Sequence, residues 1–307
     1  MVIARKLAAL HQGNPTAPKT FFLANDKSPK NALSVEKLVR PLADKHQKLH
    51  VGITQENAIS VLENIAAQKL GDHEKRFLFV DPFGYKDISI ANILRLLSGG
   101  KTELLLFQPC SFMHRFAEKS TPEALEVFLQ ELSSGQGWPQ GLGTYEYISR
   151  TKDLLQQRVG DDFFVDSFTI KKDARNIYCL FFFSPHIRGF EKMLEAKWAM
   201  DGLAGTNWHF DEVNAGELFA QNDPLTDKLE NGLLDFFSAE NGRFNFEIYE
   251  RTLRLGFLPK HAKQILESLI KRGRIRVELI EGRKGAFYLG YKDFYSRTRK
   301  IEIFKVN

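Results

Sequence analysis

The side chains best suited to chemistry in this sequence belong to Asp81, Pro82, Phe83 and Gly84, which directly follow an apolar run at residues 77–80. A carboxylate at the end of a buried strand can accept a hydrogen bond from an amino group. Proline fixes the backbone, so its carbonyl can point into a site, and the ring of Phe83 can stack on a planar base. The simpler alternative is that Asp-Pro ends the strand and that Phe83 belongs to the core.

Other candidate binding residues follow neighbouring strand-like runs. Asn25 and Asp26 close the run TFFLA, at the position where dinucleotide-binding folds place an acid on the ribose hydroxyls. Gln55 follows LHVGIT and could reach an adenine. The alternatives are an Asx turn with a helix cap for Asn25-Asp26 and, for the loop at Gln55, a cap of the following helix, which the sequence favours. His114 and Arg115 could hold a phosphate or carboxylate, or form an ion pair on a helix surface.

The C-terminal part carries a separate, basic pattern. Residues 251–307 hold 15 Lys and Arg against 5 Asp and Glu, whereas the rest of the chain holds 28 against 33. The order helix, helix, helix, hairpin in this part is that of a winged helix-turn-helix, with a third helix at 259–271, a strand at 274–280 and a return strand at 286–290. We expect a nucleic-acid surface, or alternatively a protein-contact surface, built from basic residues of the third helix and the hairpin: Lys260, Lys263, Lys271, Arg274, Arg276, Arg283 and Lys284.

The elements before this module alternate between strands and helices from about residue 19 to residue 200. Continuous apolar strands alternating with helices predict an α/β fold, a Rossmann-like, mostly parallel sheet covered on both faces. Two long strands, FFVDSFTIK and NIYCLFFFSP, are expected to pair as a hairpin. The predicted organisation is a Rossmann-like domain at 1–200, a Gly/Asn/Asp-rich linker at 201–224 and a winged-helix domain at 225–307.

Composition excludes several classes of protein. The chain has 307 residues, of which 43% are hydrophobic and 26% charged, and its longest apolar run has seven residues, far short of a membrane span. Its two cysteines form neither a disulfide framework nor a metal site, and no metal ligand set is expected. Serine-hydrolase elbows and phosphate-cradling glycine loops are absent. We therefore expect a cytoplasmic protein that does not bind a membrane.

The segment RFLFVDPFGYKDISIANILRLLSGGKTELLLFQPCSFMHRF (residues 76–116) resembles the three-Cys-motif partner family of bacterial proteins. The resemblance covers the strand, the Asp-Pro-Phe-Gly tetrad, a Leu-rich helix, a Thr-Glu strand and a closing Arg-Phe pair. It implies a fold like that of class I methyltransferases, which bind S-adenosylmethionine, and a three-Cys-motif protein as a partner. Nucleic-acid amino-methyltransferases carry a related Asp-Pro-Pro-aromatic motif at the same strand end.

One departure from the family concerns the cofactor. Methyltransferases have a first strand that ends in a glycine-rich turn around the cofactor, and this sequence begins at MVIARKLAALHQGNP, which resembles only the following helix. We expect either that Met1 is not the true start or that the cofactor site has been lost.

Two hypotheses about function follow. In the first, the protein is an S-adenosylmethionine-dependent methyltransferase acting on nucleic acid: Asp81 and the Pro82 carbonyl would hold an amino group, Phe83 would stack on it, and Asp26 would hold the ribose. In the second, it is a non-catalytic adaptor with a degenerate methyltransferase fold, and its winged helix binds DNA or RNA.

Overall fold

The computed structural model describes residues 2–11, 16–82, 89–110, 123–138, 141–173, 176–201, 207–209 and 224–306. The chain forms two compact units, one from residues 1–71 and 82–96 and the other from residues 72–81 and 97–307. The boundaries expected from the sequence, 1–200, 201–224 and 225–307, stay a prediction. Among the described residues, no helix is long and apolar enough to cross a membrane.

The first unit contains a small parallel sheet. Its elements are α1 (Val2–His11), β1 (Thr20–Asn25), α2 (Pro29–Ala43), β2 (Leu49–Thr54), α3 (Ala58–Ala67) and most of α4 (Ile90–Leu97). Strands β1 and β2 run parallel, with Asn25 opposite Thr54 at their carboxyl ends. Proline at the first position of α2 has the backbone angle that a helix start needs. The helix packs on both strands and buries Ala32 and Val39.

The second unit begins with a five-stranded sheet. Its elements are β3 (Arg76–Val80), β4 (Thr102–Gln108), α6 (Glu123–Leu132), α7 (Thr144–Val159), β5 (Phe164–Lys171), β6 (Ile177–Ser184), α8 (Ile187–Met200) and β7 (Asn207–His209). The strand order is β3-β4-β6-β5-β7. Strands β3 and β4 are parallel, β6 is antiparallel to both β4 and β5, and β7 is parallel to β5.

This sheet is therefore mixed rather than mostly parallel. The predicted hairpin of β5 and β6 is confirmed, and its short connection forces the two strands to be antiparallel. The fold is α/β, as expected, but a Rossmann-like core is not confirmed.

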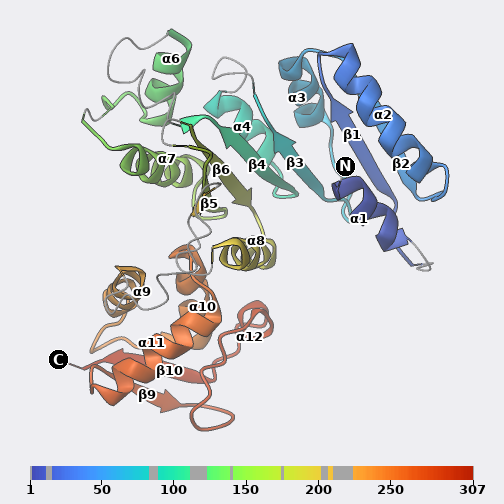
Figure 1. Ribbon diagram of the computed structural model, residues 1–307. Coiled ribbons are helices and arrows are strands. Elements are labelled where there is room, and N and C mark those ends of the chain that lie inside the picture. The colour runs from blue at the N-terminus through green and yellow to red at the C-terminus, as the bar shows by residue number, and fades with distance from the viewer. Residues whose placement is uncertain are drawn as a thin grey trace. The chain divides into compact units, whose positions relative to one another are not determined.

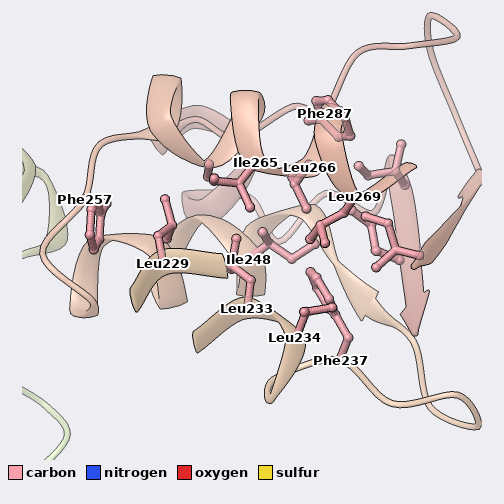
Figure 2. Packing of buried hydrophobic residues seen from close by; sticks show 14 residues of the cluster. Leu229, Leu233, Leu234, Phe237, Ile248, Phe257, Ile265, Leu266, Leu269 and Phe287 are labelled. Carbon is pink, nitrogen blue, oxygen red and sulfur yellow. The ribbon is translucent and has the colours of Figure 1, made fainter. Parts of the chain in front are cut away.

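The second unit ends in a winged helix-turn-helix. Its elements are α9 (Pro224–Leu234), β8 (Arg243–Phe244), α10 (Asn245–Arg254), α11 (Pro259–Lys271), β9 (Ile275–Leu279), α12 (Tyr291–Tyr295) and β10 (Ile301–Lys305). The three strands form a sheet in the order β8-β10-β9. Figure 2 shows leucines of α9, Ile248 of α10 and the apolar stripe of α11 converging on one core. Phe287 from the wing closes this core.

Helix α8 lies between the five-stranded sheet and α10 (Figure 1). Apolar side chains of β5, β6, α8 and α10 form a second core there, in which Phe190, Leu194 and Tyr249 are fully buried. The Tyr249 hydroxyl donates to the Glu191 carboxylate over 3.0 Å, and Arg188 pairs with the same carboxylate. Because this interface is apolar and satisfies its buried polar groups, the winged helix packs on the sheet as part of one body.

The turn between α10 and α11 is also held by α8. Gly256 has φ +90°, and its amide and that of Phe257 donate to carbonyls of the last turn of α10, which is a Schellman cap. The Trp198 indole of α8 donates to the Gly256 carbonyl over 3.0 Å. Its ring lies 4.1 Å from that of His261, whose Nδ1 accepts the Leu258 amide and so caps α11.

Replacing Tyr249 with Phe tests the buried hydroxyl at this interface. The ring stays in the core, but a buried Glu191 oxygen loses a donor, so we expect the free energy of unfolding to fall by about 1–3 kcal/mol. Urea unfolding followed by tryptophan fluorescence measures the change. Tyr145, which is 47% exposed on α7, provides the control: Tyr145→Phe should leave stability unchanged. Equal shifts in the two variants would contradict this account of the interface.

The His261 cap predicts a dependence of stability on pH. Burial, and secondarily the Lys260 charge, lowers the pKa of His261 from 6.5 to about 4. The unfolded chain therefore binds a proton that the folded chain excludes, and the stabilisation present above about pH 6.5 is lost as the pH falls towards 4. His261→Gln, which keeps an acceptor but does not titrate, should show a smaller loss of melting temperature between pH 7 and pH 5. An identical loss in both proteins would exclude this role.

Candidate nucleic-acid interface

Helix α11 has two chemically different faces. Ala262, Leu266 and Leu269 are buried in the winged-helix core, as the apolar spacing in the sequence predicted. The opposite face is solvent-exposed, and it carries a stripe of polar residues at helical spacing: Lys260, Lys263, Gln264, Glu267 and Lys271. A helix with one face fixed in a core and the other free and basic has the form that winged helices present to a groove.

The chain leaves α11 through a second Schellman cap. Gly273 has φ +64°, its amide donates to the Ile270 carbonyl, and the Arg274 amide donates to the Leu269 carbonyl. This cap sets Arg274 at the end of the helix, directly before β9. Arg274 and Arg276 are both exposed, as predicted, and the Arg276 guanidinium lies 3.9 Å from the centre of the Phe304 ring.

The wing is longer than the sequence predicted. The strand that returns beside β9 is β10, so the expected return strand at residues 286–290 is wrong. Phe287 is instead buried in the core, and Tyr288 has a positive φ of 54°, which no strand residue adopts. A 21-residue wing, residues 280–300, therefore joins the two strands and includes α12.

The tip of the wing carries Arg283 and Lys284, both exposed. The Tyr288 hydroxyl accepts a hydrogen bond from the Arg283 amide and so closes the tip on itself. Gly282, at φ +102°, makes this contact possible, because a Cβ there would lie 2.3 Å from the Tyr288 hydroxyl. The two basic side chains thus project from a tip that is already formed.

Asn245, at the start of α10, joins the two arms of the wing. The side chain is fully buried; its Oδ1 accepts the Lys300 amide over 2.9 Å and its Nδ2 donates to the Tyr288 carbonyl over 3.4 Å. Lys300 also lies 4.8 Å above the Tyr288 ring. Asn245 was not among the residues predicted from the sequence, in which its only signal is its place directly after Arg243 and Phe244 of β8.

Acidic side chains neutralise some of these cations and not others. Lys263 pairs with Glu267 over 3.8 Å, Arg272 with Glu230 over 2.5 Å, and Arg276 with Glu278. Within residues 224–306, the remaining predicted binding residues have no acidic partner: Lys260, Lys271, Arg274, Arg283 and Lys284. Exposed cations without intramolecular counterions are available to a polyanion.

The strand-end residues of the first hypothesis are only partly described. Asp81 directly follows β3 and has an exposed side chain, and desolvation on its covered side raises the pKa of the carboxyl above its usual range. Pro82 is half-buried. Phe83 and Gly84, like His114 and Arg115, lie outside the described residues. The role of these six residues stays a prediction.

Asn25 and Asp26, in the first unit, are engaged in local hydrogen bonds. Asn25 Oδ1 accepts from the Thr54 hydroxyl over 2.8 Å and from the Glu56 amide over 3.0 Å, while its Nδ2 donates to the Glu56 carbonyl. Asp26 accepts the Ser28 amide over 2.8 Å in an Asx turn, and the Asn31 side chain on its other oxygen. These bonds fasten the loops after β1 and β2.

Gln55, also in the first unit, is exposed and makes no hydrogen bond within the described part of the chain. The helix after it is capped instead by Asn57, whose Oδ1 accepts the Ile59 amide over 2.9 Å. Cofactor binding by Asn25, Asp26 and Gln55 stays a prediction. Over the described ranges, no group of three or more His, Cys, Asp or Glu side chains is arranged to hold a metal ion.

Comparison with known proteins identifies the C-terminal part only. The family model described as GMT-like wHTH domain matches residues 204–279, which run from before α9 to the end of β9. No curated protein and no solved structure matches the chain. The matched region contains α10, α11 and the turn between them, which the geometry above places in a winged-helix core. The C-terminal part of this chain is therefore a winged helix-turn-helix domain, similar to the GMT-like wHTH domain.

Proposed function

We propose that this protein binds nucleic acid through its winged helix, and that α11 and the wing tip contact the phosphate backbone. The observation that carries the proposal is the set of exposed cations that have no acidic partner within residues 224–306, which runs from Lys260 and Lys271 on α11 through Arg274 to the wing tip. Neutralising phosphates releases condensed counterions, which is the main source of sequence-independent affinity for DNA or RNA.

Two further features support this proposal. The apolar side of α11 is already used in the winged-helix core, so a protein partner on its outer face would meet lysines rather than an apolar patch. The pre-formed wing tip loses little conformational entropy when Arg283 and Lys284 bind a ligand, and preorganisation of this kind favours affinity. In this role the protein is an adaptor, for which a three-Cys-motif protein remains a proposed partner.

Binding of a fluorescent duplex of about 20 base pairs, measured by anisotropy at several salt concentrations, tests the proposal. We expect log Kd to rise with log salt by about 0.9 per phosphate contacted. A Lys271→Glu/Arg274→Glu variant should bind more weakly and reduce the slope by about 2. These two residues are chosen because neither has an acidic partner within residues 224–306.

The matched control is Lys30→Glu/Lys37→Glu, which makes the same change in net charge at two exposed positions of α2. This control should bind as the unmodified protein does. A salt-independent affinity, or equal weakening in both variants, would overturn the proposal that the winged helix is the nucleic-acid surface.

A second candidate function is a methyltransferase-like reaction near the end of β3, on a Rossmann-like core. The observation that favours it is Asp81, an exposed carboxyl at a strand end with a raised pKa. Of the side chains expected to hold S-adenosylmethionine, Asn25 and Asp26 already make hydrogen bonds that fasten their loops, whereas Gln55 makes none within the described residues. The adaptor role is the better supported of the two, because it rests on exposed cations that have no acidic partner within residues 224–306.

Calorimetric titration with S-adenosylmethionine separates the two candidates. For the adaptor we expect no heat and no rise in melting temperature at a ligand concentration of about 1 mM, at which a Kd of about 10 μM would give roughly 2.7 kcal/mol of stabilisation. Binding that Asp26→Ala weakens, with unchanged stability of the unliganded variant, would instead favour the enzyme.

A further inference from the structure

The end of the wing carries a second basic surface, formed by Tyr295, Arg297 and Arg299. The decapeptide that contains them, residues 291–300, holds four basic residues and one acidic residue. The acidic residue, Asp293, lies 3.8 Å from Lys300. Helix α12, at the start of this decapeptide, packs on α10. The second basic surface is thus on a different element from the basic stripe of α11.

Both arginines of this surface are fixed by aromatic rings rather than by acids. The Arg299 guanidinium lies 4.4 Å from the centre of the Phe244 ring. That of Arg297 lies 4.8 Å from the Phe294 ring and 5.2 Å from the Phe246 ring. Neither pairs with an acid anywhere in residues 224–306, and both side chains are exposed. Stacking therefore orients the two charges without neutralising them.

The backbone brings one of these arginines back over the rings. Arg297 has a positive φ of 50°, and its amide donates to the Phe294 carbonyl over 3.2 Å at the end of α12. A non-glycine residue adopts this conformation at a cost of about 1 kcal/mol or more. The reversal places the guanidinium against the ring of Phe294, three residues earlier.

Tyr295 adds an exposed aromatic ring to the two arginines. Its side chain is 77% exposed, and its ring centre lies 5.8 Å from that of Tyr291. Tyr291 is itself held by His186, the N-cap residue of α8, whose Nε2 lies 3.4 Å from the Tyr291 hydroxyl. A single exposed ring is common on protein surfaces. Tyr295 stands two and four residues along the chain from two arginines that have no acidic partner within residues 224–306. An aromatic ring and cations on one short segment are the combination that binds unpaired nucleotides, since the base stacks on the ring and the cations meet the phosphates.

We propose that Tyr295, Arg297 and Arg299 bind an unpaired stretch of nucleic acid, in addition to the duplex that α11 and the wing tip bind. This inference rests on the proposed nucleic-acid binding and specifies its substrate as a nucleic acid with a single-stranded segment. Stacking of one base on an aromatic side chain contributes about 1–3 kcal/mol. The preferred ligand is thus a duplex with an overhang rather than a blunt duplex.

The test compares a blunt duplex of about 20 base pairs with the same duplex carrying a single-stranded overhang of about 15 nucleotides at one end or at the other. An overhang of this length is enough for a typical single-strand binding site of about 4–16 nucleotides. We expect the protein to bind an overhang duplex about 5–100 times more tightly than the blunt one. Tyr295→Ala should abolish this preference and leave affinity for the blunt duplex unchanged. Because the ring is exposed, this substitution should not unfold the protein.

The charge contribution is tested with Arg297→Glu/Arg299→Glu, which should also remove the preference, and with Arg297→Lys/Arg299→Lys, which should retain most of it. Tyr145→Ala on α7 is the matched aromatic control and should keep the full preference. Equal affinity of the unmodified protein for blunt and overhang duplexes, or a preference that survives Tyr295→Ala, would overturn this inference alone. No binding of any duplex would overturn the proposed function as well.

Discussion

The packing of α8 against the helix-turn-helix is the constraint on which the rest of the second unit depends. Trp198 and the buried pair of Tyr249 and Glu191 hold the turn before α11 in place. Arg254 adds bonds to the Asp161 and Phe163 carbonyls, next to β5. Many winged helices are connected to neighbouring domains only by a linker. Here the helix that would meet nucleic acid is fixed to the sheet, so its orientation does not depend on the segment that connects α8 to α9.

Within residues 224–306, five arginines lie over aromatic rings and four pair with acids. Arg243 and Arg276 do both, whereas Arg297 and Arg299 are held by rings alone. An acid would hold an arginine in place but would cancel its charge. A ring holds it and leaves the charge available to a phosphate. The high phenylalanine content therefore has a second role besides filling cores, since Phe244, Phe294 and Phe304 each support a cation at the surface.

The sequence predicted those parts of the fold that depend on local signals. The third helix was expected at residues 259–271, where Pro259 starts α11 and Gly273 follows its end, and two long strand-like runs close together in the sequence indicated a hairpin. The wing could not be predicted in the same way, because the apolar, aromatic run around Phe287 is typical of a strand, and only the core decides that this ring turns inwards. Asn25 and Asp26 were compatible with ligand binding and with loop closure; the loop-closing partners of Asn25 lie about 30 residues away, at the end of β2 and just after it.

The mixed sheet and the winged helix belong to one compact unit, and Asp81 directly follows the first strand of that sheet. A nucleic acid bound on α11 would therefore be held in a fixed relation to this strand end, through β4, β6, β5 and α8 in turn. Fixed geometry of this kind is needed by an enzyme that presents a base to a reacting group, and equally by an adaptor that presents nucleic acid to a partner protein. The two functions therefore make the same demand on the frame, namely that β3, α8 and α11 keep their relative positions.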